Sequence, residues 1–460
     1  MSAMTLPSIP EVLRNAGPRP WLLGYDVNAI QELITAPSRP IAMLGVSATI
    51  RLFDEAVEHR HAVFSGGGRG LLLVPSPEEA EARGYQLVRD FRQNTYGGVL
   101  AAAWAPYDPG NPRGSLRWLH SKLELAKDAA EAPGHEQLVL PRHKSEECAD
   151  CNLYTATHNV SRKDGPDERV CLRCRAMVDA GRGQHRDLAE RIQSLVDLDS
   201  ARKRWIAAIS IDGNNLGEFF RGLETLEALR EGSETIAKLF QDAGHVARNG
   251  LNRDIISLAT GGDDLRLFMA AAFVLPYLET FVQHLESSAN AQAKRFPLLA
   301  RLGVGIGAVI ADPRLPARQL MHHAHELERS AKHICRDDHV RSALDFTVLT
   351  AGTASIHDPS TRANDLRPVA MTGLPTLLDA ARRVRELPTS QLALLDGAAA
   401  DSEFTNLLCY QVARSPEWQR WYTAAGHDWR NPKIVLDERP RPVHLDLARL
   451  QTIAGDGHAI

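Results

Sequence analysis

The chain has 460 residues, a formal net charge of −4 and 24% charged side chains. Its length exceeds that of one ordinary folding core and predicts two or three domains, while the small net charge excludes wholesale coating of nucleic acid or of an anionic membrane surface. The longest strongly apolar runs, such as 270–278, are too short to cross a bilayer and the N-terminus lacks a signal-peptide pattern, so we expect a cytoplasmic protein with no membrane partner.

The first part of the chain alternates strand-like and helical patterns. A short apolar run at 21–27 predicts a buried strand, with Asp26 near its end. Two apolar runs within 61–76 flank a glycine cluster and predict a hairpin whose tip needs positive φ or a close backbone approach. The remaining segments predict helices at 28–59 (broken near its prolines), 77–94 and 115–131, and strands at 97–107 and 135–141.

Four of the six cysteines form two Cys-x-x-Cys pairs that are 19 residues apart: Cys148, Cys151, Cys171 and Cys174. This spacing is typical of a structural zinc site with four thiolate ligands in a reducing compartment. The surrounding insert has too few apolar residues to fold on its own core, so the metal would hold it together. A closed site of this kind leaves no open position for catalysis. Redox use is the weaker alternative, and His143 or His158 could replace one ligand.

Downstream of the cysteines the same order of patterns returns. A strand within 204–220 carries Asp212, and a helical segment separates it from an apolar hairpin at 255–270. The tip of that hairpin reads Gly261-Gly262-Asp263-Asp264. The patterns then predict a helix at 271–294, a strand at 302–311, a helix at 316–336 and a strand at 343–350.

Three unlike features occupy matching positions in the two halves. Asp26, the cluster Ser65-Gly66-Gly67-Gly68-Arg69 and Lys127 parallel Asp212, the Gly261–Asp264 tip and Lys332. The repeat is too long for a solenoid unit and indicates two copies of a whole α+β domain. The alternative is coincidence between generic α/β patterns.

The pattern from 366 to 425 is helical, and the tail at 437–460 is irregular at its end. We therefore expect four parts: a first, degenerate domain at 1–141, a cysteine insert with a linking helix at 142–200, a second domain at 201–352, and a helical region with its tail at 353–460.

The two adjacent carboxylates at the second hairpin tip indicate chemistry. Asp263 and Asp264 repel each other, and a merely structural turn would favour a single charge. Asp212, brought beside them by strand pairing, would complete a cage for Mg²⁺ or Mn²⁺, and two such ions can activate an attacking hydroxyl and stabilise a leaving pyrophosphate. The alternative is a solvated acidic turn.

Further residues near this turn are candidate nucleotide contacts. The backbone NH groups of Gly261 and Gly262 can approach phosphate oxygens closely, and Gly213 lies in the Asp-Gly turn that follows the other strand. Lys332 could bind a triphosphate or be a solvated lysine of a charged helix. Asn214, with its neighbour Asn215, could contact ribose, but capping of the following helix is the favoured role.

The segments IDGNNLGEFF and ATGGDDLRLFM, with the paired Cys-x-x-Cys motifs and a first half that has a degenerate glycine hairpin, resemble the large subunit of type III CRISPR effector complexes. The palm domains of this CRISPR polymerase are related to nucleotidyl cyclases and GGDEF cyclases. The resemblance covers about residues 20–425 and implies an α+β fold with two ferredoxin-like palm domains, a zinc-binding insert between them and a C-terminal helical region.

The resemblance also implies a function. The second palm of the family uses ATP and divalent metal ions to make cyclic oligoadenylate messengers in antiviral defence. Carried over, Asp212, Asp263 and Asp264 would hold Mg²⁺ or Mn²⁺, Gly261 and Gly262 would contact phosphates, and the first palm would bind a nucleotide without turnover at Ser65, Gly66 and Gly67. The implied partners are ATP, other CRISPR effector subunits, and guide and target RNA.

Three departures keep other functions open. Asn214 stands where many members have a second acid, no N-terminal His-Asp nuclease domain is found, and the length is short for a full large subunit. A silent scaffold that binds nucleotide or RNA is therefore one alternative, and a GTP-using dinucleotide cyclase is another. The protein could also act alone or as an oligomer.

Overall fold

The structure is a computed structural model of the chain. It describes residues 6–57, 59–130, 138–162, 165–184, 205–251, 255–337, 340–349, 367–375, 410, 412–424, 428–430, 434–436 and 439–441. The linking helix expected before residue 201 and most of the helical region expected after 353 lie outside the described residues.

The first half forms an antiparallel four-stranded sheet in the order β2-β3-β1-β4. Its strands are β1 (Trp21–Val27), β2 (Ala62–Gly66), β3 (Arg69–Val74) and β4 (Leu100–Pro106). Its helices are α1 (Ile9–Ala16), α2 (Ile30–Thr35), α3 (Pro40–Ala56), α4 (Pro77–Thr95) and α5 (Pro112–Ala129). Because β1 is apolar on both sides, α3 and α4 can cover one face of the sheet while α1 and α5 cover the other.

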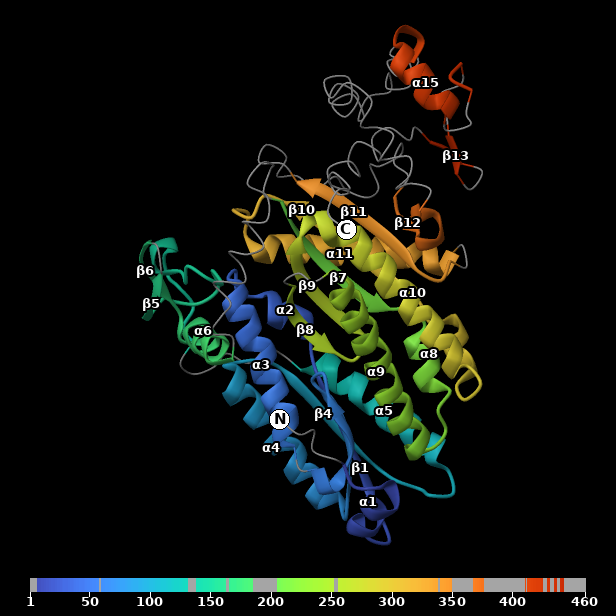
Figure 1. The fold of residues 1–460 in the computed structure, drawn as a ribbon. Helices are drawn as coiled ribbons and strands as arrows, with labels where there is room; N and C mark the ends of the chain where they lie inside the picture. Colours follow the sequence, from blue (N-terminus) through green and yellow to red (C-terminus); the bar gives the residue numbers. More distant parts are fainter. Residues whose placement is uncertain are drawn as a thin grey trace.

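The second half repeats this arrangement with two added edge strands, in the order β12-β11-β10-β7-β9-β8. Its strands are β7 (Ile206–Gly213), β8 (Ile256–Gly261), β9 (Asp264–Ala270), β10 (Val304–Ala311), β11 (Ala343–Leu349) and β12 (Val369–Ala370). The helices are α8 (Leu216–Arg221), α9 (Leu226–Leu251), α10 (Val274–Gln292) and α11 (Ala317–Asp337). Figure 1 shows α9 and α10 side by side over one face of this sheet, while α11 packs on the other face.

The four strands shared by the two halves have the ferredoxin-like order. In this order the fourth strand, which follows the second crossover helix, pairs with the first strand. The two-palm α+β fold expected from the sequence is confirmed. One predicted strand is wrong: residues 138–141 of the segment 135–141 are irregular. Val139 and Leu140 are exposed there, and the Val139 carbonyl oxygen accepts a hydrogen bond from the insert residue Thr155 instead of joining the sheet.

The cysteine insert comprises the hairpin β5 (His158–Arg162) and β6 (Gly165–Val170) and the helix α6 (Leu172–Gln184). The insert lies beside α3 (Figure 1). The crossing of α3 and α6 is very close, because a Cβ atom at Gly45 would lie 1.8 Å from the Met177 carbonyl oxygen and one at Gly181 would lie 2.0 Å from that of Ile41. Glycine at both positions therefore lets the insert dock on the first palm.

The two palms are held together by α9 of the second. Arg230 on this helix is 9% exposed, and its guanidinium donates to the carbonyl oxygens of Ala62 and Val63 at 2.7 Å each and to that of Pro7. Leu226 of the same helix packs in the cluster formed by α1, α5 and the first sheet. The described C-terminal elements are α15 (Pro416–Ala424), β13 (Ile434–Leu436) and β14 (Arg439–Arg441). Among the described residues, no helix combines the length and apolarity needed to cross a bilayer.

Candidate active site of the second palm

Three carboxylates meet at one end of the second sheet. Antiparallel pairing of β7 with β9 places Asp212 directly opposite Asp264, and Gly261 at the end of β8 pairs with the same residue. Gly262 turns the hairpin with a φ of 64°, and Asp263 completes its tip. A Cβ atom at Gly213 would lie 3.2 Å from that of Asp263. Glycine at 213 therefore allows the hairpin tip to approach the end of β7.

Burial makes the carboxylates of Asp212 and Asp264 difficult to ionise without a counterion. Burial and the neighbouring Asp264 raise the pKa of Asp212 well above its ordinary value. Burial and Asp263 likewise raise the pKa of Asp264. Hard divalent cations take carboxylate oxygens as ligands and would supply the missing positive charge. The donor set thus fits Mg²⁺ or Mn²⁺, although the oxygens of the three acids do not form a closed cluster within 4.8 Å of one another.

Lys332 on α11 reaches the same carboxylates. Its side chain is 18% exposed, and its ammonium pairs with Asp212 and lies 3.6 Å from Glu328 Oε1. Burial alone would lower the pKa of Lys332, but the attraction of Asp212 and Glu328 outweighs it and raises that pKa. The alternative of a solvated surface lysine is wrong.

A fourth carboxylate, Glu328, was not predicted from the sequence. Its side chain is 1% exposed, and its Oε2 atom accepts a hydrogen bond from Ser210 Oγ at 2.8 Å and contacts His325 Nδ1 at 2.9 Å. Burial opposes its ionisation, but His325 and Lys332 lower its pKa overall. Glu328 therefore stays charged and fixes the position of Lys332 beside Asp212.

Two glycines of β10 allow α11 to bring these side chains so close. A Cβ atom at Gly305 would lie 2.4 Å from Lys332 Cγ, and one at Gly307 would lie 1.9 Å from the Ala324 carbonyl oxygen. Gly305 is also the register partner of Asp212. The alternating glycines of the strand GVGIGAVIA were the one sequence signal that could have indicated this contact.

Arg266 on β9 is a second buried cation that sequence reasoning missed. It is 2% exposed and stands opposite Ser210 in the β7–β9 register. Burial lowers the pKa of its guanidinium, and this effect outweighs the attraction of Asp264 and Glu328, which would raise that pKa. Its Nη2 atom has no hydrogen-bond partner in the described part of the chain.

The expected capping role of the two asparagines is wrong. Asn215 occupies the N-cap of α8 in a left-handed conformation, but its side chain makes no capping hydrogen bond. Asn214 is buried, and its side-chain amide donates to the Arg341 carbonyl oxygen at 3.2 Å. An aspartate at 214 would place carboxylate oxygens against that carbonyl oxygen. The asparagine is therefore explained by local hydrogen bonding, and a ribose contact stays a prediction.

The first palm carries the counterpart of this site with different charges. Asp26 pairs in register with Arg69, as Asp212 does with Asp264. Lys127 Nζ lies 2.6 Å from Asp26 Oδ2, repeating the pair of Lys332 and Asp212. Gly67 and Gly68 form the tip with φ values of 66° and 79°. The repeat expected from matching sequence features thus extends to the side-chain pairs.

The predicted nucleotide contacts of the first hairpin are partly engaged inside the protein. Ser65 Oγ lies 2.7 Å from Tyr25 Oη and donates to the Asp54 carbonyl oxygen at 3.0 Å. The Gly68 amide donates to the Asp54 carboxylate at 2.9 Å. Gly66 is exposed and a Cβ atom there would meet nothing within 4 Å, which leaves the side of the tip formed by Gly66 and Gly67 open.

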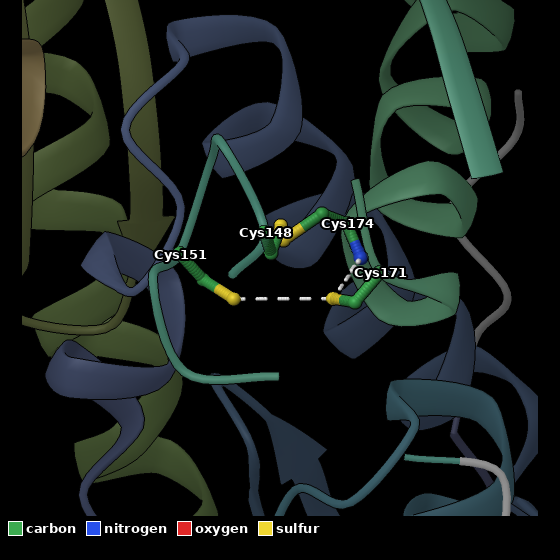
Figure 2. Close-up of side chains that lie close together, drawn as sticks. All are labelled: Cys148, Cys151, Cys171 and Cys174. Carbon is green, nitrogen blue, oxygen red and sulfur yellow. Dashed lines mark hydrogen bonds between the residues drawn. The ribbon is translucent and has the colours of Figure 1, made fainter. Parts of the chain in front are cut away.

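The four cysteines form a compact buried cluster (Figure 2). Cys148, Cys151, Cys171 and Cys174 are each at most 2% exposed, and their sulfurs lie within 4.8 Å of one another. The Sγ atoms of Cys151 and Cys171 are 3.8 Å apart, the spacing of about 3.8 Å that a tetrahedron with ~2.3 Å zinc–sulfur bonds requires. Backbone amides of Asp150 and Cys174 donate to cluster sulfurs. These donors fit Zn²⁺ in a closed, structural site.

Comparisons with known proteins agree with this geometry. Residues 205–340 match the family model described as Cas10/Cmr2, second palm domain. No curated protein sequence matches the chain significantly. The fold is similar to that of the apo Csm1–Csm4 cassette, with a TM-score of 0.59 and 14% identity over 95% of this chain and 70% of that one. It is also similar to the cassette in complex with cA4 (TM-score 0.58, 14% identity, 97% and 71% covered) and in complex with AMPPNP (0.56, 16%, 97% and 71%).

The matched segment contains all three acids and Lys332. At 14–16% identity, the likeness to the solved structures is one of fold. Together, the domain match and the shared fold confirm the predicted resemblance to the large subunit of type III CRISPR complexes.

Proposed function

We propose that this chain, which has a Cas10-type second palm and the fold of Csm1, is a metal-dependent nucleotidyltransferase that converts ATP into cyclic oligoadenylates. One observation carries the proposal: Asp212 faces Asp264 across β7 and β9, with Asp263 at the adjoining tip and Lys332 beside them. Structures of similar fold in complex with AMPPNP, cA4 and cA3 support the choice of adenine nucleotides.

The acids would hold Mg²⁺ or Mn²⁺ at the second hairpin. When bound, such ions polarise the phosphates and favour ionisation of the attacking hydroxyl. Lys332 is the counterion of Asp212. If Asp212 were to ligate a cation, the Lys332 ammonium would be free to pair with the triphosphate. Backbone amides at Gly261 and Gly262 would donate to phosphate oxygens, and Gly213, which lets Asp263 approach the end of β7, is a further proposed contact.

The reaction joins nucleotides through phosphodiester bonds. The 3′-oxygen of one nucleotide attacks the α-phosphorus of another, and a new phosphorus–oxygen bond forms. The bond between the α-phosphorus and the bridging oxygen to the β-phosphate breaks, so pyrophosphate leaves, and the hydroxyl proton passes to solvent water. The same step within one oligonucleotide closes the ring.

The first palm would bind a nucleotide but would not itself catalyse a reaction. Its hairpin tip has Arg69 opposite Asp26, where the second palm has Asp264 opposite Asp212, so it lacks the tip carboxylates that a two-metal site needs. Ser65, Gly66 and Gly67 are the proposed contacts for this nucleotide. The open backbone at Gly66 supports this assignment, and the engagement of Ser65 with Tyr25 limits that residue to a weaker contact.

Similar folds are found in Csm1–Csm4 cassettes, which supports a second effector subunit of the Csm4 kind as partner. We extend the proposal to guide and target RNA as activators and to a role in antiviral defence in the cytoplasm. The four-cysteine insert would bind Zn²⁺ as a structural ion.

A catalytically silent scaffold remains the second candidate, favoured by Asn214. The side chain at this position is turned to the Arg341 carbonyl oxygen, so it does not add a carboxylate to the site. Such a protein would bind ATP without releasing pyrophosphate.

The test is incubation of the full chain with labelled ATP and Mg²⁺ or Mn²⁺, with and without candidate activator RNA. We expect pyrophosphate release and cyclic products, both lost in Asp263→Ala/Asp264→Ala, whereas the exposed Glu234→Ala on α9 serves as the unaffected control. Nucleotide binding without any pyrophosphate would support the scaffold and contradict the proposal. Turnover of GTP in preference to ATP would support a dinucleotide cyclase.

A further inference from the structure

A short helix of the first palm reaches the acids of the second. Gln31 on α2 donates a hydrogen bond from Nε2 to Asp264 Oδ2 at 2.8 Å. Its neighbour Ile30 lies against the other hairpin, because a Cβ atom at Gly68 would be 2.8 Å from Ile30 Cδ1. Helix α2 therefore touches the tip of both palms with consecutive residues.

The far end of α2 is held by α11 and by the cysteine cluster. Arg318 at the start of α11 donates to the carbonyl oxygens of Ala36 at 3.3 Å and Cys151 at 3.1 Å. Asp150, which lies between the first two cysteines, accepts hydrogen bonds at one oxygen from Ser38 Oγ and from the backbone amides of Ser38 and Arg39, at 2.7–3.0 Å. The segment after α2 is thus attached to the knuckle that bears Cys148 and Cys151.

We propose that α2 is the element through which the cysteine knuckle positions Gln31 on Asp264, so that Gln31 is a positioning residue for the metal site of the second palm. The inference rests on the proposed function, because it assigns Asp264 to a divalent cation. It adds a residue of the first palm and a residue of the insert, Asp150, to that site.

The geometry of α2 makes its position dependent on these contacts. A helix of six residues has little stability of its own, since isolated helices shorter than about 12–15 residues are marginal in water. Asp150 is 1% exposed, so its hydrogen bonds to Ser38 and Arg39 are shielded from water. Loss of the knuckle would release the end of α2 and with it the amide that binds Asp264.

The hydrogen bond from Gln31 orients the carboxylate for a metal. It fixes Oδ2 of Asp264 and leaves Oδ1 for the cation. Gln31 Oε1 is buried without a partner in the described part of the chain. An unsatisfied buried acceptor destabilises the fold, so this glutamine is a poor choice for stability alone. Its placement is better explained by the carboxylate that it orients.

The experiment measures Mn²⁺ binding to the nucleotide-free full chain by calorimetry and by the electron paramagnetic resonance signal of free Mn²⁺. Gln31→Met keeps the length of the side chain and removes its donor. We expect binding to weaken about 10-fold or more, the usual effect of losing a hydrogen-bond partner of a metal ligand. Gln283→Met is the matched control, because Gln283 also donates to a carboxylate, that of Glu279, at an exposed position of α10.

The knuckle is tested by Asp150→Ala and by the conservative Asp150→Asn, with zinc content measured in both. We expect Asp150→Ala to keep its zinc and to weaken Mn²⁺ binding, as Gln31→Met does. In the Gln31→Met background, Asp150→Ala should cause no further loss of Mn²⁺ affinity. The conservative Asp150→Asn should retain most of the affinity. Additive losses, or a lower unfolding temperature with unchanged Mn²⁺ affinity, would overturn the coupling through α2.

Failure of the metal site itself has a separate signature. If Asp263→Ala/Asp264→Ala binds Mn²⁺ as the natural chain does, the proposed function loses its metal site and this inference falls with it. If those substitutions abolish binding while Gln31→Met leaves it unchanged, the inference alone is wrong.

Discussion

The buried Asp54 of the first palm makes the strongest pH-dependent prediction. Its carboxylate accepts hydrogen bonds from Tyr25 Oη at 3.2 Å and from the Gly68 amide at 2.9 Å, beneath the first hairpin tip. Asp54 is 6% exposed. Burial raises its pKa from the ordinary value of 3.8 to about 6, although the Gly68 amide and Tyr25 oppose the shift. An asparagine at position 54 could accept the hydrogen bond from the Gly68 amide without carrying a charge.

The sign and size of the stability change with pH follow from the raised pKa of Asp54. Between pH 4 and pH 6 the folded protein holds the Asp54 proton more tightly than the unfolded chain, so this group stabilises less as the pH rises through that window. The shift spans roughly two pH units, and each unit is worth about 1.4 kcal/mol. Ionised Asp54 therefore costs the fold up to about 3 kcal/mol above pH 6, and roughly half of that at pH 5.

We expect Asp54→Asn to stabilise the protein at pH 8 by about 1–2 kcal/mol more than at pH 5. A domain of 150–250 residues gains about 2–4 °C of unfolding temperature per kcal/mol, so the difference is measurable by thermal unfolding at the two pH values. Glu81→Gln, at an exposed position of α4, is the control and should show no such difference. An equal effect at both pH values, or destabilisation at pH 8, would refute a carboxyl group whose pKa is raised by burial.

Two further substitutions test the packing around the second hairpin. Gly307→Ala would place a Cβ atom 1.9 Å from the Ala324 carbonyl oxygen, so we expect it to displace α11. The free energy of unfolding, measured by urea titration, should fall by about 1–3 kcal/mol or more, and pyrophosphate release should be abolished. Gly217→Ala, whose Cβ atom meets nothing within 4 Å, should leave both measurements nearly unchanged. Asn214→Asp should destabilise by about 1–3 kcal/mol, because its carboxylate would face the Arg341 carbonyl oxygen. A higher Mn²⁺ stoichiometry in this variant would contradict that reasoning.

The duplicated fold could be predicted because its signals are local. Apolar strands, a glycine hairpin and a lysine-bearing helix recur in the same order, and strand pairing then fixes the register. Asp212 opposite Asp264 and Asp26 opposite Arg69 are direct consequences of that register. The strand expected at 135–141 is wrong at residues 138–141, where Val139 and Leu140 are exposed and the Val139 carbonyl oxygen bonds to the insert instead of the sheet edge. A short apolar run does not indicate which neighbour it will pack against.

The remaining features of the site depend on contacts between distant segments. Glu328 looks like one more acid of a charged helix, and only the close crossing of α11 over Gly305 and Gly307 buries it beside Ser210. Gln31 is separated from Asp264 by 233 positions and follows no motif. Periodicity and spacing carry no information on such pairs, since the first arises from the packing of α11 on its own sheet and the second from the packing of one palm against the other.

The chemistry of each palm depends on a few side chains on a shared backbone frame. In the second palm, Asp263 and Asp264 follow the turning glycine, and with Asp212 and Glu328 they lie near two cations, Lys332 and Arg266. In the first palm the corresponding positions are Gly68 and Arg69, so the hairpin tip bears a cation in place of the two acids, and Lys127 pairs with Asp26 and Glu124. Adjacent carboxylates at a hairpin tip call for divalent cations, whereas a tip that bears an arginine can attract a triphosphate without them. Under the proposed function, the same hairpin would serve turnover in one palm and nucleotide binding in the other. Helix α2, which contacts both tips, is placed to make the first palm's contacts part of the second palm's metal site.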